Sequence, residues 1–306
     1  MKKEHVLCLA VLLLVLVPVL RAQDSERSEE ILPLILTPAE DPPRAYTTTL
    51  YIMNLANTTV EITVEAFADG EPAAVLDADP EPVARTTIRL ESGESVRHLL
   101  IPRPLGSDPN PLRRAWLRLT SPDPGSFAAS ARVTHFLLGN REEVEADSER
   151  ATDFLELDRR IISDVQFDSV HPSGDFKSFL SWDGFEGCFP GAMSAYSVIN
   201  PNSETATLRI RFVEFVSPHN RLIHVTSFRL PAGTRINRLL SEVFPELFPP
   251  PEGRNACSDH FIHQSGVLDL SSDLPVAMVA INLNLATQHF VDLPVRVVAE
   301  AIPDDN

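Results

Sequence analysis

Two stretches decide the fold prediction: Asn54-Leu-Ala-Asn-Thr-Thr-Val-Glu-Ile-Thr-Val64 and Asn200-Pro-Asn-Ser-Glu-Thr-Ala-Thr-Leu-Arg-Ile210. Each opens with an Asn and a short polar segment, and then places apolar residues at every second position. A period of two is typical of a strand with one buried face, and the polar residues before it predict a turn. Each stretch therefore predicts strand, turn, strand. The apolar positions match in pairs: Val60 with Ala206, Ile62 with Leu208, and Val64 with Ile210.

Two further pairs of stretches match in the same order along the chain. Residues 89–100 and 229–240 share Arg-Leu, two residues, a Gly, a Val or Ile, and Leu-Leu. The shared glycines, Gly93 and Gly233, are expected at a positive φ in a tight turn. Residues 116–121 and 267–272 each place two leucines around a charged residue before a small polar turn. Three ordered matches indicate that the chain contains two diverged copies of one mostly β unit.

The predicted fold is all-β, with two tandem immunoglobulin-like antiparallel β-sandwich domains and a short helix in the second. Short alternating segments separated by Pro, Gly, Asn and Asp favour this class. The helix is expected within 237–247, where Leu239, Leu240, Val243, Phe244 and Leu247 recur at helical spacing behind Asn237 as a cap. Residues 277–283 are apolar on both faces at their start, which predicts a central strand covered on both sides.

The expected organisation has five parts. Residues 1–22 form a signal peptide, 23–30 a disordered acidic lead-in, 31–160 the first sandwich, 161–302 the second, and 303–306 a loose tail.

The first residues have the pattern of a secretory signal. Lys2 and Lys3 precede an apolar run over 6–20, and cleavage is expected after Ala22. The alternative is a permanent membrane anchor, but the run is shorter than the roughly 20 residues that a span needs. We therefore expect an extracytoplasmic protein, secreted or periplasmic, with no stable membrane insertion after cleavage.

The net charge argues against two classes of partner. Removal of residues 1–22 takes away Lys2, Lys3, Arg21 and Glu4, which changes the formal net charge from −17 to −19. So acidic a chain should repel nucleic acid and anionic membrane surfaces.

Two cysteines remain after the signal, Cys188 and Cys257. Outside the cytoplasm such a pair usually forms a disulfide, worth about 4 kcal/mol for a loop of this length. A metal site or two free thiols are the alternatives.

One cluster suggests chemistry. His260 and His263 lie close to Asp259 and Cys257, a set that would ligate a transition metal if the thiol were free. A surface loop beside a disulfide is the simpler interpretation. The chain has no Gly-x-Ser-x-Gly and no His-Glu-x-x-His motif, so no catalytic residue, metal ligand or cofactor is assigned.

An aromatic cluster surrounds Cys188. Trp182, Phe185 and Phe189 would bind a carbohydrate or a partner protein if they were exposed in a loop. Aromatic residues beside a disulfide more often pack in the core, and both interpretations stay open.

A family resemblance rests on three stretches of the second half. They read Leu230-Pro-Ala-Gly, Leu239-Leu-Ser-Glu-Val-Phe-Pro-Glu-Leu247 and Ser265-Gly-Val-Leu-Asp-Leu-Ser-Ser-Asp-Leu-Pro-Val-Ala277. The chain thereby resembles the exported bacterial tandem immunoglobulin-like β-sandwich repeat proteins of unknown function. The opening of the first half, Ile31-Leu-Pro-Leu-Ile35 and Thr49-Leu-Tyr-Ile-Met-Asn54, is similar to the same group, but this half lacks the Phe-Pro helix. The resemblance implies export and a sandwich fold, and it transfers no catalytic residue.

The leading functional hypothesis is a non-catalytic secreted structural or binding module, with a protein or carbohydrate as ligand. The alternatives are a secreted hydrolase or metal-dependent enzyme with its site near His260 and His263, and an accessory subunit of a larger envelope assembly. An apolar or aromatic surface patch rimmed by polar groups would favour the first hypothesis.

Overall fold

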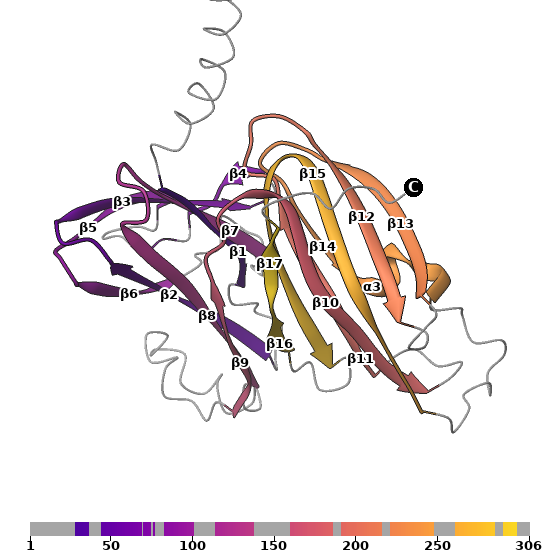
Figure 1. The fold of residues 1–306 in the computed structure, drawn as a ribbon. Helices are drawn as coiled ribbons and strands as arrows, with labels where there is room; N and C mark the ends of the chain where they lie inside the picture. Colours follow the sequence, from indigo (N-terminus) through magenta and orange to yellow (C-terminus); the bar gives the residue numbers. More distant parts are fainter. Residues whose placement is uncertain are drawn as a thin grey trace, which may run out of the picture.

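The structure, a computed structural model, describes residues 28–36, 44–68, 70–74, 76, 83–100, 114–137, 160–185, 191–215, 221–247, 261–284 and 290–298. Antiparallel strands make up nearly all of its regular structure (Figure 1), which confirms the all-β prediction.

The first half of the chain contributes two sheets. One sheet has the order β5-β3-β7-β1, with β4 at the end of β3, and we call it the β5 sheet. The other has the order β6-β2-β8-β9, and we call it the β6 sheet. The strands are β1 (Ser28–Leu36), β2 (Arg44–Asn54), β3 (Val60–Ala68), β4 (Glu71–Pro72), β5 (Arg85–Leu90), β6 (Ser95–Leu100), β7 (Arg114–Ser121), β8 (Phe127–Leu137) and β9 (Arg160–Asp168).

The second half repeats this arrangement with one long strand in place of two. The first part of β15 pairs with β10 and β12, and its second part pairs with β11 and β16. All eight strands are hydrogen-bonded into one sheet, joined through β15 and the β10–β11 pairing, and we name its two parts: β13-β12-β15-β10 is the β13 sheet, and β14-β11-β15-β16 is the β14 sheet. The strands are β10 (Ser173–Phe185), β11 (Ala192–Ile199), β12 (Ala206–Phe215), β13 (Arg221–Leu230), β14 (Arg235–Leu239), β15 (Phe261–Asn284), β16 (Phe290–Leu293) and β17 (Val295–Val297), which pairs with β10.

Residues that match in sequence also occupy matching places in the two sets of sheets. Val64 lies opposite Leu119, and Ile210, which matches Val64, lies opposite Leu270. Strand β2 pairs with β6 as β11 pairs with β14, and β3 pairs with β5 as β12 pairs with β13. The two halves therefore have the same pairing order.

The topology shares its centre with an immunoglobulin domain and differs in the strands around that centre. With the short β4 set aside, the second strand pairs with the fifth and the third with the sixth, as in immunoglobulin domains. The first strand, however, lies beside the sixth rather than the second, and the seventh lies beside the second rather than the sixth. The antiparallel sandwich is thus established, whereas this strand order is not the immunoglobulin one.

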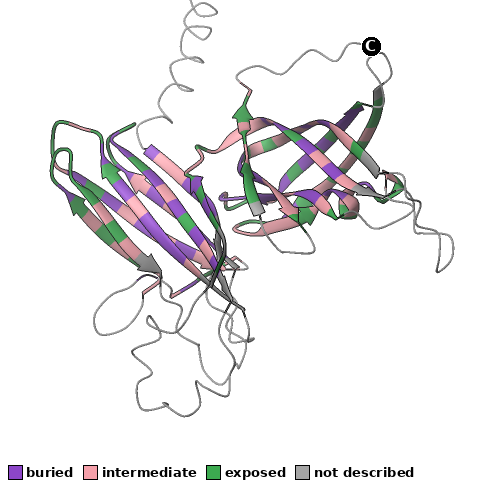
Figure 2. Cartoon of the chain, turned by 90° about the horizontal axis from the view of Figure 1, so that it is seen from below, coloured by how far each residue is buried: buried purple, intermediate pink, exposed green. Residues whose placement is uncertain are grey.

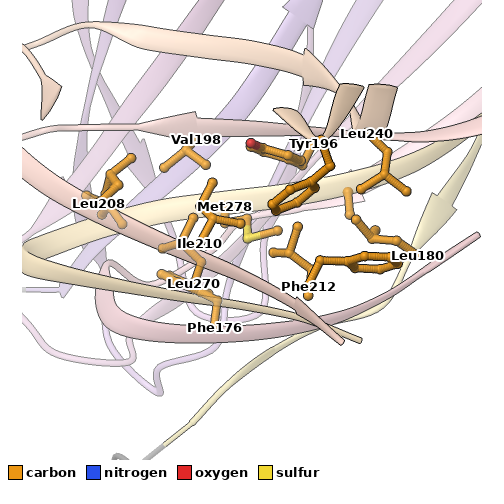
Figure 3. Close-up of a cluster of buried hydrophobic side chains, with 14 of the residues drawn as sticks. Phe176, Leu180, Tyr196, Val198, Leu208, Ile210, Phe212, Leu240, Leu270 and Met278 are labelled. Carbon is orange, nitrogen blue, oxygen red and sulfur yellow. The ribbon is translucent and has the colours of Figure 1, made fainter. Parts of the chain in front are cut away.

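Each half has its own hydrophobic core between its two sheets. The first core combines Ile62 and Leu119 of the β5 sheet with Ile52 of the β6 sheet. The second core, shown in Figure 3, combines side chains of the β13 sheet with others of the β14 sheet and one residue of the short helix. Its central members include Phe176, Leu180, Tyr196, Val198, Leu208, Ile210, Phe212, Leu240, Leu270 and Met278.

The strand predicted to be covered on both sides is the second part of β15, and the prediction is confirmed. Met278 and Ala280 point into the second core, whereas Ala277 packs with Ile31 and Trp116 of the first half. All five residues from 276 to 280 are buried. The first half therefore packs against the outer side of this strand.

Several sequence-based boundaries need correction. Strand β1 begins at Ser28, inside the expected disordered lead-in. Strand β9 pairs with β8, so by its hydrogen bonds it goes with the first half, although the boundary expected after residue 160 assigned it to the second. The predicted helix is confined to α3 (Leu240–Val243) and the 3-10 turn η3 (Pro245–Leu247), because Asn237 belongs to β14 and Pro245 interrupts the helix. The signal peptide expected at 1–22 and the loose tail expected at 303–306 lie outside the described residues.

The two Asn residues that open the matched stretches are buried and bind the same set of backbone groups. Asn54 Nδ2 donates to the carbonyls of Thr58 (2.8 Å), Leu90 (3.1 Å) and Glu91 (3.0 Å). Asn200 Nδ2 donates to the carbonyls of Glu204, Leu230 and Pro231, at 2.7, 2.9 and 3.2 Å. Each Oδ1 accepts the N–H two residues on, at 2.7 Å for Ala56 and 3.0 Å for Asn202. Each Asn thus joins its own turn to the end of a distant strand, before glycines at φ 72° (Gly93) and 66° (Gly233).

We predict that Asn54→Ala and Asn200→Ala each lower the free energy of unfolding by about 2–4 kcal/mol, because each removes a buried amide that donates to three carbonyls. Asn57→Ala, at an exposed position of the same turn, is the control, with an expected effect below about 0.5 kcal/mol. Urea denaturation measures all three. Equal losses for Asn54→Ala and Asn57→Ala would contradict this role.

Candidate functional site

The candidate site is an apolar row across the outer face of the β13 sheet. Four side chains lie directly opposite one another on adjacent strands: Phe179 of β10, Val267 of β15, Val213 of β12 and Ile223 of β13. The ends of this row are open, with Phe179 50% and Ile223 56% exposed. We call these four residues the apolar row.

The alternation of each strand explains why the row faces outward. Leu180, Leu268 and Phe212, the chain neighbours of three row residues, are each 0% exposed in the second core. Because successive side chains of a strand point to opposite faces, the row must lie on the other side of the sheet. Figure 2 shows this alternation of buried and exposed residues along the strands.

Further apolar side chains widen the row toward one edge of the sheet. Phe215 (38% exposed) and Val225 (53% exposed) lie two residues from Val213 and Ile223 on the same strands, and so share their face. Among the described residues, β13 pairs with β12 alone. An exposed apolar patch therefore reaches an open sheet edge, an arrangement that monomeric proteins normally avoid.

Charged residues border the row on one side. Lys177, Asp269 and Arg211 form the neighbouring row of the same face, each opposite the next. Lys177 Nζ lies 3.6 Å from Asp269 Oδ1, and Arg211 is exposed. The face therefore has the apolar centre and polar rim that are typical of protein interfaces.

The sheet beneath the row depends on one close contact at Gly266. This residue precedes Val267 in β15 and lies opposite both Leu180 and Glu214. A Cβ at this position would lie 2.6 Å from Phe212 Cζ and would also overlap the Val213 carbonyl oxygen. Only glycine leaves room for the Phe212 ring beside β15 at this point. Gly266 therefore fixes the position of the Phe212 ring on the inner side of the sheet, next to Val213.

A histidine and two carboxylates lie behind the same strands. His224 Nε2 is 3.3 Å from Glu214 Oε2, and its Nδ1 is 3.1 Å from Glu246 Oε1. Glu214 is 3% exposed, and the His224 ring packs 5.8 Å from that of Phe244. The cluster joins η3 to β12 and β13 and closes one end of the second core. Since these residues come from three separated segments, no local sequence pattern predicted it.

The residues singled out from the sequence are only partly brought together. His263 lies opposite Asp183, and the two side chains are joined by an exposed hydrogen bond. Trp182 is 2% exposed and packs in the second core 6.0 Å from Phe212, so the idea of an exposed Trp182 is wrong. It points inward because its neighbours in β10, Ser181 and Asp183, occupy the outer face. Cys188, Phe189, Cys257, Asp259 and His260 lie outside the described residues, and so does the Phe185 side chain.

Within the described ranges, no group of three or more His, Cys, Asp or Glu side chains is placed to hold a metal ion. None of the helices described there is long and apolar enough to cross a membrane.

Comparisons with known proteins add little. No protein-family model matches the chain, and no curated protein matches it. Among solved structures it is similar to vicilin from hazelnut, Corylus avellana, at 12% sequence identity, over 85% of this chain and 78% of that chain. The TM-score of 0.14 is too low for this likeness to support any statement about the fold.

We predict that Gly266→Ala lowers the free energy of unfolding by about 3 kcal/mol, because the added methyl group must displace Phe212 or the β12 backbone. The control is Gly191→Ala, where the nearest atom to the new Cβ is a carbonyl oxygen at 3.9 Å. Thermal denaturation compares the two variants. If Gly266→Ala costs no more than Gly191→Ala, the Phe212 ring is not held as described.

Proposed function

We propose that the protein is a non-catalytic, extracytoplasmic binding module that contacts a partner protein through the apolar row. The observation that carries the proposal is the exposure of Phe179 and Ile223 on a sheet face bordered by charge. Apolar area of this kind is stabilised by burial, at about 25 cal/mol per Å². A partner protein that covers the row and meets the charged rim would recover this free energy.

The module consists, in this proposal, of two diverged copies of one sandwich. Support comes from the common pairing order and from the equivalent hydrogen bonds of Asn54 and Asn200. Two independent folds would not be expected to bury an Asn in the same turn and bind it to the same strand end.

The proposed location outside the cytoplasm rests on the signal-like residues 1–22 and on the Cys188–Cys257 pair. The described strands support the pairing, because Phe185 at the end of β10 lies opposite Phe261 at the start of β15. Cys188 comes three residues after Phe185, and Cys257 four residues before Phe261. Each residue of chain spans at most about 3.6 Å, so both cysteines can reach the separation of about 5.5 Å between Cα atoms that a disulfide needs.

We therefore expect peptide mapping without reduction to find one peptide pair joined through Cys188 and Cys257, and to find it separated after reduction. Two free thiols on the exported protein would show that the pair does not close.

The binding proposal is tested with a photo-reactive phenylalanine analogue at position 179, in the protein expressed from its full coding sequence in its own source. We expect one dominant cross-linked protein, because the partner covers Phe179. The same analogue at Ser227, an exposed outer position of β13, is the control and should give little product. No product above this control at position 179 would contradict the proposed function.

A further inference from the structure

The face of the first half that corresponds to the face of the apolar row is the outer side of the β5 sheet, and it packs against the second half. On the outer side of the β5 sheet, Phe67 lies opposite Trp116, and their rings stack with centroids 4.4 Å apart. Trp116 Nε1 donates to the Gly233 carbonyl at 3.3 Å, and the Arg118 guanidinium donates to the Pro201 carbonyl. A sheet face of one half is therefore seated on the turns at one end of the other half.

The surface that receives this face is buried at its centre and partly buried at Gly233 and Arg235. Ile199 and Ala277 are each 0% exposed and pack with Trp116. Arg235 Nη1 donates to the Ala115 carbonyl at 2.8 Å. A Cβ on Gly233 would lie 3.4 Å from the Gly70 carbonyl oxygen, so the two backbones approach closely at this turn.

The apolar row lies on the face of the second half that corresponds to the outer side of the β5 sheet. Phe67 opposite Trp116 corresponds, through matched strand pairing, to Val213 opposite Val267. The pair in the first half is covered by the receiving surface of the second half. The pair in the second half lies at the centre of the row, which the described residues leave open at Phe179.

The first half also has an equivalent of the receiving surface, and this one is exposed. Met53 and Leu55, which flank Asn54, are 47% and 55% exposed. They correspond to Ile199 and Pro201, which flank Asn200 and are buried. The remaining equivalents, Gly93, Ser95 and Ala128, match Gly233, Arg235 and Ala277 and are also exposed. We call Met53, Leu55, Gly93, Ser95 and Ala128 the free end.

The two open surfaces carry exposed charges of opposite sign. Arg211 borders the apolar row beside Lys177, which pairs with Asp269. The turn of the free end carries Glu91 and Glu94, both exposed, and Glu91 Oε1 lies 3.8 Å from Arg89 Nε. Attraction between Arg211 and Glu94 would orient an approaching chain on the free end.

We propose that chains associate head to tail, with the apolar row of one chain seated on the free end of the next. The partner is thus a second copy of this chain, and the contact repeats the one between the two halves. The inference rests on the proposed function of the row as a binding surface. Because the two surfaces are different, the interface is heterologous, and it builds open chains or rings rather than a closed face-to-face dimer.

Two double variants test this by complementation, using protein expressed from its full coding sequence. The row variant is Phe179→Ser with Ile223→Ser, and the end variant is Met53→Ser with Leu55→Ser. Ile161→Ser with Val291→Ser is the control, because these side chains are equally exposed (56% and 52%) but lie on β9 and β16. Unchanged thermal unfolding shows that each variant folds.

Sedimentation velocity over a range of concentrations gives the readout. We expect the natural protein and the control to form species larger than a dimer, and each double variant to associate at least about tenfold more weakly. An equimolar mixture of the row and end variants should form dimers and stop there, because only one intact row and one intact free end can meet.

Other outcomes overturn the inference and separate it from the proposed function. Undiminished association of the end variant, with loss in the row variant, means that rows pair with each other. A natural protein that stays monomeric means that chains do not associate; cross-linking of position 179 to a different protein then leaves the proposed function standing. Monomers without any cross-link remove both.

Discussion

The alternation of side chains along each strand is the constraint from which the rest of this structure follows. Every strand of a sandwich has one face toward its own core and one face away from it, and each outer face must be polar, covered or used. In the second part of β15 the outer residue Ala277 is covered by the first half, while Met278 fills the core. In β12 the inner residue Phe212 is buried in the same way, but the outer face next to it carries the apolar row, whose ends Phe179 and Ile223 are exposed. The two halves therefore differ mainly in what covers their outer faces.

Buried side-chain hydrogen bonds hold the ends of these sandwiches. Asn54 and Asn200 each donate to the carbonyl at the end of a distant strand and to carbonyls of the adjoining turns, and each does so where two strands and a turn converge. Removing such a buried donor would take bonds from three carbonyls at once. The turn after Asn200 then presents the Pro201 carbonyl to Arg118. Local turn chemistry thus positions the contact between the halves.

Much of the fold could be predicted from the sequence, because the alternation of apolar and polar residues over short stretches indicates the strands. The period of two identified β3 and β12, and the run at 277–283 identified a strand covered on both faces. The fate of β9 and the length of the helix were mispredicted, because pairing with β8 and the break at Pro245 are decided by tertiary context. The register of the strands is also non-local, because only the structure places Phe179 opposite Val267.

The candidate site was missed for this reason, although Phe179, an aromatic residue at an outward position beside the inward Leu180, was its available signal. Attention to Trp182 was misplaced because an aromatic cluster in sequence does not say which ring points inward.

The most direct test of the account is hydroxyl-radical footprinting of the protein as its concentration is raised. Phe179 and Met53 lie on different halves and are both about half exposed, so both should be oxidised readily in dilute solution. If outer faces are covered as described, the oxidation rates of the two residues fall together with increasing concentration, while that of the exposed Ile161 stays constant. Rates for Phe179 and Met53 that do not change at any concentration would contradict it.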